Sequence, residues 1–409
     1  MIRPSVSLFL LVALAGSAAA AQPVPLGPEM RVDTVESRQP DVPFVAAQAG
    51  GGFEIAWSYK NAEAPLVVAR HFDADGAPTD ASPVALGGLG PYPSVRGVTA
   101  TNGGFEVLWQ LGGSPRQPHY RRHLDLRGTP APGKPVQMGG TGWSTRWVWQ
   151  VRGSGFMDGW PIVKNHMPVG LAVQRLDTSG GLTGPVLRLN SRLVYDDDRP
   201  ILAGLAGGGF LAVWNGVISE PVNTYRSVVR ARRFSPAGKP LGSDFDVHSK
   251  VPEEGDILHS PRVATAPGGG FAVAWSFFDS GASASTPYLR LFDAAGRPRG
   301  REIPGPATAD RVEAMAFDAA GRLLVLWGEG LERPGEVDLE AQLFGPRAEA
   351  LGPPERIATE ASGRFQRPLR GNVAWAEGSW LVTWVAETDE GYLGPKAVFV
   401  RRFAGEEEP

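Results

Sequence analysis

The chain repeats one short phrase seven times: a glycine turn, a large apolar residue, an alternating segment and then a tryptophan. The first copy reads Gly51-Gly52-Phe53-Glu54-Ile55-Ala56-Trp57. The other copies cover residues 103–109, 155–160, 208–214, 269–275, 321–327 and 378–384. A regular repeat constrains the architecture strongly, because each copy is one structural unit that must bury its apolar face against its neighbours.

A second anchor follows each tryptophan, in a segment that often contains Arg or His and ends in Phe or Leu. These anchors are Phe72, Leu124, Leu176, Phe234, Phe292, Phe344 and Phe403. They lie 52 to 59 residues apart. This period fits a four-stranded propeller blade better than a helical repeat. The sequence therefore predicts an all-β, seven-bladed β-propeller.

Alternation within the repeat indicates how the blades pack. Phe271, Val273 and Trp275 would share one face of a strand, and Ala272 and Ala274 would share the other. Large side chains on one face and small ones on the other allow adjacent blades to nest.

The two ends of the chain predict how the propeller closes. The seventh repeat ends soon after Phe403 and has no segment for a fourth strand. Residues 25–32 match the fourth-strand pattern of residues 240–247. We therefore expect the N-terminal strand to complete the last blade, which leaves no open gap between first and last blades.

The repeats resemble those of exported bacterial β-propeller proteins with the pattern Gly-Gly-Phe-x-Val-x-Trp followed by Arg-Arg-Phe-Asp-x-x-Gly-x-Pro-x-Gly. The resemblance covers essentially all of residues 22–409 and departs most from the pattern in blade 3. It implies the fold but not the activity, because propellers host binding, scaffolding and catalysis alike.

Residues 1–21 have the pattern of a secretory signal peptide. Arg3 precedes an apolar stretch over residues 8–15, and small residues 17–21 favour cleavage before Gln22. The expected mature protein is one propeller domain over residues 22–409, exported to the periplasm or secreted. No later segment is long and apolar enough to predict a membrane span.

The amino-acid composition limits the classes of partner that the protein can bind. The formal net charge is −3, which argues against a nucleic-acid partner. The chain has no cysteine, which excludes disulfides, thiol catalysis and cysteine-ligated zinc. We expect a monomer whose partner is an envelope or extracellular protein or a glycan.

The connections between strands two and three, and between successive blades, are long and variable, and they lie on one face of a propeller. We call this the long-loop face and expect ligand contacts there. The candidate ligand-binding residues are Trp143, Arg146, Trp147, Asp158, Tyr195, Asp196, Asp197, Asp198, Phe278, Asp279 and Tyr392.

No cofactor or metal is predicted, with calcium left as one alternative. The acidic run Asp196–Asp198 could bind Ca²⁺ or could be a solvated loop that caps a turn. Residues 73–76 resemble the start of a calcium loop but are explained by turn chemistry. His119 and His123 fall in a strand, where their spacing separates them by about 13 Å, so they do not predict a metal site.

Asp158 is the residue that breaks its repeat, since it stands where the other copies carry Ile55, Val107 or another apolar residue. It could be functional, or blade 3 could be degenerate or paired in a different register. A buried carboxylate needs a partner, and Arg146 or Lys164 are conceivable ones.

Three functions remain open on the sequence. The leading one is a non-catalytic propeller that binds a protein or glycan through the long-loop face. A carbohydrate-active enzyme with carboxylates at the channel mouth is the first alternative. A structural part of a cell-envelope assembly is the second. The sequence contains no His-Glu-x-x-His, Gly-x-Ser-x-Gly or phosphate-loop motif that would decide the matter.

Overall fold

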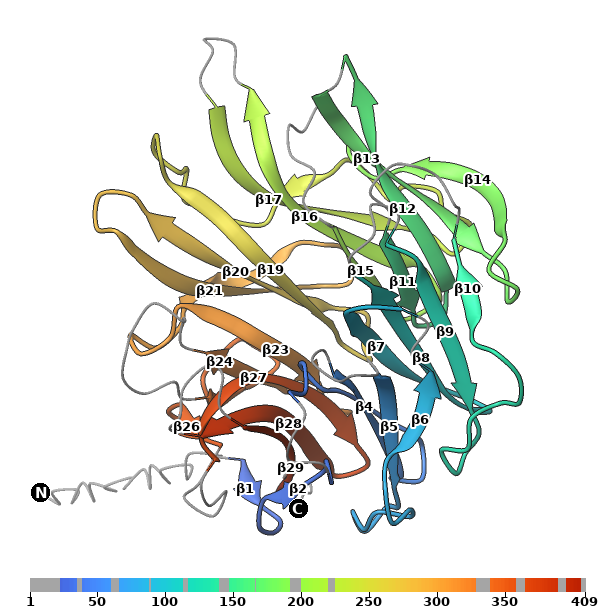
Figure 1. The fold of residues 1–409 in the computed structure, drawn as a ribbon. Coiled ribbons are helices and arrows are strands. Elements are labelled where there is room, and N and C mark those ends of the chain that lie inside the picture. Colours follow the sequence, from blue (N-terminus) through green and yellow to red (C-terminus); the bar gives the residue numbers. More distant parts are fainter. Residues whose placement is uncertain are drawn as a thin grey trace, which may run out of the picture.

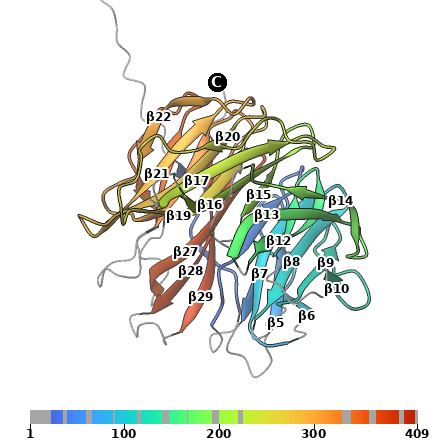
Figure 2. The ribbon, with the colours of Figure 1, turned by 90° about the horizontal axis from the view of Figure 1, so that it is seen from above.

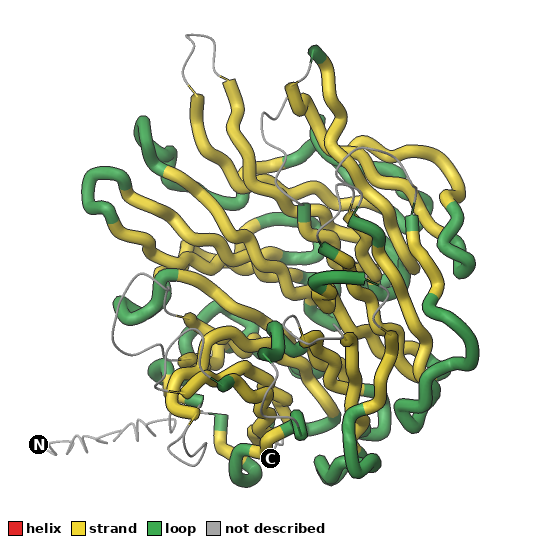
Figure 3. Tube along the Cα trace, viewed as in Figure 1, coloured by secondary structure: helices red, strands yellow, loops and turns green. Residues whose placement is uncertain are grey.

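The computed structural model describes residues 23–34, 39–59, 66–87, 90–112, 117–139, 147–165, 167–191, 200–219, 225–328, 339–357, 365–388 and 395–405. These residues form seven antiparallel sheets, which confirms the predicted seven-bladed β-propeller. Figure 3 shows only strands and connections in the described part of the chain. That part includes no helix with the length and apolarity needed to cross a membrane.

Blades 1 to 4 each consist of four consecutive strands in sequence order. Blade 1 comprises β3 (Phe44–Ala47), β4 (Phe53–Tyr59), β5 (Leu66–Phe72) and β6 (Val84–Gly87). Blade 2 comprises β7 (Pro93–Thr101), β8 (Gly104–Leu111), β9 (His119–Leu124) and β10 (Val136–Met138). Blade 3 comprises β11 (Trp147–Val151), β12 (Gly155–Lys164), β13 (Met167–Leu176) and β14 (Leu182–Arg188). Blade 4 comprises β15 (Ile201–Gly204), β16 (Phe210–Ser219), β17 (Tyr225–Phe234) and β18 (Phe245–Asp246).

Blades 5 and 6 follow the same order, and blade 7 takes its outer strands from the N-terminus. Blade 5 comprises β19 (Ile257–Thr265), β20 (Phe271–Asp279), β21 (Ala284–Phe292) and β22 (Pro298–Pro304). Blade 6 comprises β23 (Arg311–Phe317), β24 (Leu323–Gly328), β25 (Leu339–Phe344) and β26 (Glu355–Arg356). Blade 7 comprises β27 (Phe365–Ala376), β28 (Ser379–Thr388) and β29 (Lys396–Ala404), with β1 (Val24–Pro25) and β2 (Met30–Arg31).

The closure predicted from the chain ends is present. Strands β1 and β2 both pair antiparallel with β29, with Val24 opposite Ala404 and Met30 opposite Val400. Figure 1 shows the N-terminal strands, in blue, beside the C-terminal strand in red. Val32 then donates its N–H to the Val398 carbonyl at 2.7 Å. The last blade therefore gains its fourth strand from the start of the chain.

The blades nest as the alternation of large and small residues predicted. Phe271, Val273 and Trp275 of blade 5 pack against Leu211 and Val213 of blade 4. On the other face of β20, Ala272 and Ala274 pack against blade 6. The repeated tryptophan is thus an interblade core residue; Trp57, Trp109, Trp214, Trp275, Trp327 and Trp384 are all at most 2% exposed.

An arginine in the third strand ties most blades to the preceding one. Its guanidinium donates to a backbone carbonyl at or beside the neighbour's outer strand. The bonds are Arg70 to Val32 (2.7 Å), Arg122 to Leu86 (2.7 Å), Arg232 to Leu189 (3.2 Å), Arg290 to Val247 (2.9 Å) and Arg401 to Ile357 (3.2 Å). Blades 3 and 6 carry a glutamine at this position.

The first strands of the blades form a closed ring, because each contacts the first strands of both neighbouring blades. Figures 1 and 2 show the sheets arranged around this centre. The ring brings together residues from blades that are far apart in sequence, and its end on the long-loop side contains the residues described next.

Candidate functional site

Four of the first strands carry a β-bulge at the long-loop end of the ring. The pairing shifts between Val95 and Gly97 in β7, His259 and Arg262 in β19, Val312 and Ala314 in β23, and Pro368 and Arg370 in β27. In β7 and β23 the bulge is directly beside the strand-two tryptophan. A bulge redirects side chains and is common beside functional sites.

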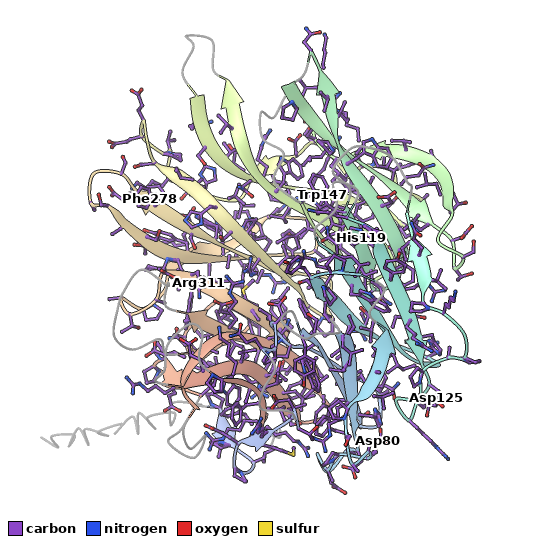
Figure 4. The ribbon with its side chains drawn as sticks, in the orientation of Figure 1. Asp80, His119, Asp125, Trp147, Phe278 and Arg311 are labelled. Carbon is purple, nitrogen blue, oxygen red and sulfur yellow. The ribbon has the colours of Figure 1, made fainter. Side chains whose placement is uncertain are left out.

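These bulges place a group of charged side chains at the long-loop end of the ring, which we call the ring mouth. It comprises Arg96, Arg262, Arg311, Glu313 and Arg370. Figure 4 shows Arg311 well separated from Asp80 and Asp125, which follow the third strands of blades 1 and 2 toward the opposite face. The ring mouth is therefore on the face where the sequence predicts ligand contacts.

Two arginines of consecutive blades contact Glu313 at the ring mouth, and the charge of a third, Arg370, acts on one of them. Arg262 of blade 5 donates to the Glu313 carbonyl oxygen at 3.0 Å and to the Pro261 carbonyl at 3.1 Å. Arg311 of blade 6 forms an ion pair with the Glu313 carboxylate. Arg370 of blade 7 is exposed and makes no hydrogen bond or ion pair within the described part of the chain.

The environment of Arg262 disfavours its positive charge. Burial lowers the pKa of Arg262, the carboxylate of Glu313 opposes that shift, and the charges of Arg370 and Arg311 lower the pKa further. Within the described residues, the three arginines have two carboxylates beside them, those of Glu313 and Asp310, both paired with Arg311. Such an arrangement is typical of a site that receives a negatively charged group.

The blade 1 and blade 2 side of the ring mouth is polar. Arg96 Nε donates to Gln110 Oε1 at 2.9 Å, and Ser94 Oγ donates to Asp41 Oδ2 at 2.9 Å. Arg96 is exposed by its solvent-accessible area; desolvation nevertheless lowers the pKa of its guanidinium, and the nearby charge of Asp41 opposes this. Amide, hydroxyl, carboxylate and guanidinium groups together can form hydrogen bonds with a polyhydroxylated ligand.

Of the candidate residues predicted from the sequence, Phe278 and Asp279 lie on the long-loop face. Phe278 is half-buried at the end of β20, opposite Ile257, which is 50% exposed. Asp279 Oδ1 accepts a hydrogen bond from the Ala282 N–H at 2.9 Å. Phe278 thus offers an apolar surface, whereas Asp279 caps the turn of its own hairpin.

Trp147 and Asp158 are buried, which differs from their prediction as ligand contacts. Trp147 is 6% exposed and packs beside Trp149 in the core between blades 3 and 4. Asp158 is fully buried. A Cβ built on Gly139 of blade 2 would lie 3.1 Å from Asp158 Oδ2, so this carboxylate is at the contact of blades 2 and 3.

The suggestion that blade 3 pairs in a different register is wrong. Asp158 is opposite Val148 and Gln174, just as Ile55 of blade 1 is opposite Val45 and Arg70. Lys164, proposed as its partner, is exposed six residues along the same strand, roughly 20 Å away. Asp158 therefore occupies the ordinary interblade position with a polar side chain.

The remaining candidates lie outside the described residues. These are Trp143, Arg146, Tyr195, Asp196, Asp197, Asp198 and Tyr392. The calcium alternative at Asp196–Asp198 thus stays a prediction. Among the residues that the structure does describe, no three His, Asp or Glu side chains group as metal ligands.

The turn interpretation of residues 73–76 agrees with the structure. Asp73 Oδ1 accepts the Ala77 N–H at 2.8 Å, and Gly76, at φ +87°, donates to the Asp73 carbonyl. His119 and His123 both lie in β9, as predicted, and His123 pairs with Glu106 at 3.0 Å.

A separate cavity of about 230 Å³ lies at the opposite face, between blades 5 and 6. Phe271, Phe292, Phe317 and Arg299 are among its lining residues, and the lining contains no carboxylate. It is therefore not the two-carboxylate pocket of a typical glycoside hydrolase.

The basic cluster was not identified from the sequence because the bulges shift its spacing. In each repeat the distance can be counted from the arginine to the large apolar residue after the glycine turn. It is nine residues for Arg96 and Arg262, ten for Arg370 and twelve for Arg311. When the repeats are aligned on the glycine turn, these arginines therefore fall at different alignment positions. An arginine count at the start of each first strand, without fixed spacing, is the signal that could have found them.

No family model and no curated protein matches the chain. Among solved structures, it is similar to polysaccharide lyase Uly1, with 8% identity, a TM-score of 0.53 and 95% of each chain covered. It is also similar to a protein of unknown function from Dyadobacter fermentans, with 10% identity, a TM-score of 0.50 and coverage of 94% of this chain and 99% of that one. At these identities the likeness shows a shared fold.

Proposed function

We propose that this protein is an exported, monomeric binding propeller that recognises a glycan at the ring mouth without cleaving it. The observation that carries the proposal is the set of bulged first strands, which bring Arg96 and Ser94 of blade 2 to the same end of the ring as charged residues of blades 5 to 7. The buried Gln110 of β8 holds Arg96 in place. Donors and acceptors held by one another in a rigid ring suit sugar hydroxyl groups, because little ordering entropy is lost on binding.

The similarity to a polysaccharide lyase supports a relation to carbohydrates and makes cleavage the second candidate. The state of Glu313 favours binding instead. Its carboxylate is 5% exposed and is held in an ion pair with Arg311. A general acid or base must reach the proton that it transfers, and this carboxylate is committed to holding the arginine.

A glycan array with residues 22–409 tests the proposal, followed by titration of each hit in solution. We expect saturable binding with no change in oligosaccharide length. Arg96→Ala should weaken binding about tenfold, the effect of losing roughly 1.4 kcal/mol. The matched control is Arg127→Ala, an exposed arginine in the turn after β9 on the opposite face, which should bind normally.

Two results would contradict the proposal. Shortened products, new reducing ends or unsaturated sugars would make the protein an enzyme. If no glycan binds and one envelope protein is captured saturably, the protein instead binds a protein partner or belongs to an envelope assembly.

A further inference from the structure

We infer that Arg262, Arg311 and Arg370 form an anion subsite that takes the carboxylate or sulfate group of an acidic glycan. This inference rests on the proposed function and names the substrate class of the same site. The three side chains come from the first strands of blades 5, 6 and 7, which are neighbours in the ring.

Two of the arginines are fixed in position before any ligand arrives. Arg262 is held by the carbonyl groups of Glu313 and Pro261, at 3.0 and 3.1 Å. Arg311 is held by the Glu313 carboxylate and lies 3.9 Å from Asp310 Oδ1. The Asp310 carbonyl in turn accepts a hydrogen bond from Ser276 Oγ of blade 5 at 2.9 Å. The anchoring network therefore joins two blades and keeps both cations close together.

Arg370 completes the cluster as its exposed member. It has no hydrogen-bond or ion-pair partner in the described part of the chain, and its charge acts on Arg262. An exposed guanidinium next to the half-buried Arg262 can approach an incoming anion with little desolvation cost. Its planar fork matches carboxylate and sulfate oxygens in pairs, which a lysine ammonium cannot do.

The electrostatic balance favours a negative group. The three arginines have only two described carboxylates beside them, Glu313 and Asp310, and both of these pair with Arg311. Burial and the two neighbouring cations disfavour the charge of Arg262, which Glu313 only partly opposes. A bound anion would remove the repulsion in a partly desolvated setting, where charge interactions are stronger than in water. The ligand therefore contributes the countercharge that the site lacks.

The rest of the ring mouth indicates that the anion is carried on a sugar. Ser94 and Arg96 of blade 2 provide an uncharged and a charged hydrogen-bonding group rather than an extended basic surface. The formal net charge of −3 also disfavours polyanions that bind by charge alone, such as nucleic acids. A single acidic substituent read among sugar hydroxyls fits both observations.

The experiment compares oligogalacturonate, a sulfated galactan oligosaccharide and a neutral galactan oligosaccharide of equal length. Binding to residues 22–409 is measured calorimetrically at two salt concentrations. We expect at least one acidic oligosaccharide to bind about tenfold or more tightly than the neutral one, with affinity falling as salt rises. The carboxylated and sulfated arms show which substituent the subsite prefers.

Arg370→Gln is the main variant, because Arg370 is exposed and its removal breaks no described contact. It should lower acidic-glycan affinity about tenfold, reduce the salt dependence and leave neutral-glycan affinity unchanged. Arg127→Gln is the control and should bind like the parent protein. Melting temperatures of both variants should match the parent, which separates a binding loss from unfolding.

The outcomes separate this inference from the proposed function. Equal binding of acidic and neutral glycans, unaffected by Arg370→Gln, overturns the anion subsite and leaves glycan binding intact. If polyglutamate binds as tightly as the acidic glycans and Arg370→Gln weakens its binding equally, the inference that the anion is carried on a sugar is wrong. Binding of no glycan at all overturns the proposed function and the subsite together.

Discussion

The buried pair Glu54 and His71 shows how a polar pair can occupy positions between two blades without disturbing the fold of either. Glu54 Oε2 lies 3.1 Å from His71 Nδ1, and the two side chains are 1% and 7% exposed. The turn of blade 2 approaches closely: at Gly128, with φ +76°, a Cβ would fall 2.5 Å from His71 Cβ and 2.9 Å from Glu54 Oε2. Only glycine fits this contact between blades 1 and 2.

The titration of Glu54 makes the stability of this contact pH-dependent. Burial raises the pKa of Glu54 to about 7, outweighing the hydrogen bond and charge of His71, which lower it. In an unfolded chain the ordinary value is 4.5. Between these values the folded protein binds more protons than the unfolded chain, so this group's contribution to stability falls as pH rises from 4.5 to about 7.

Glu54→Gln tests this at the residue scale, because it keeps the shape and removes the charge. Relative to the parent protein, the free energy of unfolding of Glu54→Gln should increase by about 1–3 kcal/mol between pH 5 and pH 8. Urea unfolding at several pH values measures the difference. Glu106→Gln is the control: Glu106 is 12% exposed and paired with both Arg121 and His123, and its replacement should show no such increase. If the difference in unfolding free energy between Glu54→Gln and the parent does not change with pH, the proposed titration of Glu54 is wrong.

At the scale of the strand, the arginine of the third strand links one blade to the next. Arg290 donates to the Val247 carbonyl and lies over the Phe292 ring at 5.8 Å. In blades 3 and 6 the equivalent residues are Gln174 and Gln342, which bind carbonyl groups of their own blades at 2.8 and 3.0 Å. These two blades therefore lack the described arginine bond to the preceding blade.

Arg290→Gln converts blade 5 to the arrangement of blades 3 and 6. It should destabilise the protein by about 1–3 kcal/mol, because a partly buried carbonyl loses a charged donor and the Phe292 ring loses its cation. Chemical denaturation gives the change in unfolding free energy. Arg297→Gln, in the exposed turn of the same blade, should change it by less than about 0.5 kcal/mol. Equal effects of both substitutions would show that the interblade bond contributes little.

At the scale of the whole molecule, the N-terminal strands hold the ring closed. Leu26 and Val32 donate to the Arg402 and Val398 carbonyls at 2.9 and 2.7 Å. The Val32 carbonyl also accepts from Arg70 of blade 1. Residues 24–32 thus complete blade 7 and also connect it to blade 1.

Removing every residue before Pro43 should open this closure. The loss of buried Val32 and of several hydrogen bonds should cost at least about 3 kcal/mol, which for a domain of this size lowers the melting temperature by roughly 4 °C or more. Differential scanning calorimetry makes the measurement, and residues 22–409 are the matched control. An unchanged melting temperature would mean that the pairing with β29 does not secure the ring.

The sequence alone determined the blade count, the order of strands and the closure. These depend on local patterns: a glycine turn, the alternation of Phe271, Val273 and Trp275, and a missing fourth strand after Phe403. Because each pattern recurs, every copy can be interpreted by comparison with the others. Asp158 was found in the same way, as a departure from its column, but whether it was buried or accessible depended on the neighbouring blade.

The composition of the ring mouth follows from how the folded blades are arranged. Arg262 and Arg370 are more than 100 residues apart in sequence, and their charges interact because the ring of first strands brings blades 5, 6 and 7 together. The bulges add residues at different points of each first strand, which removes the regular spacing that a sequence comparison needs. Local periodicity therefore encodes the blades, whereas the site arises from closure of the ring and from the irregularities within it.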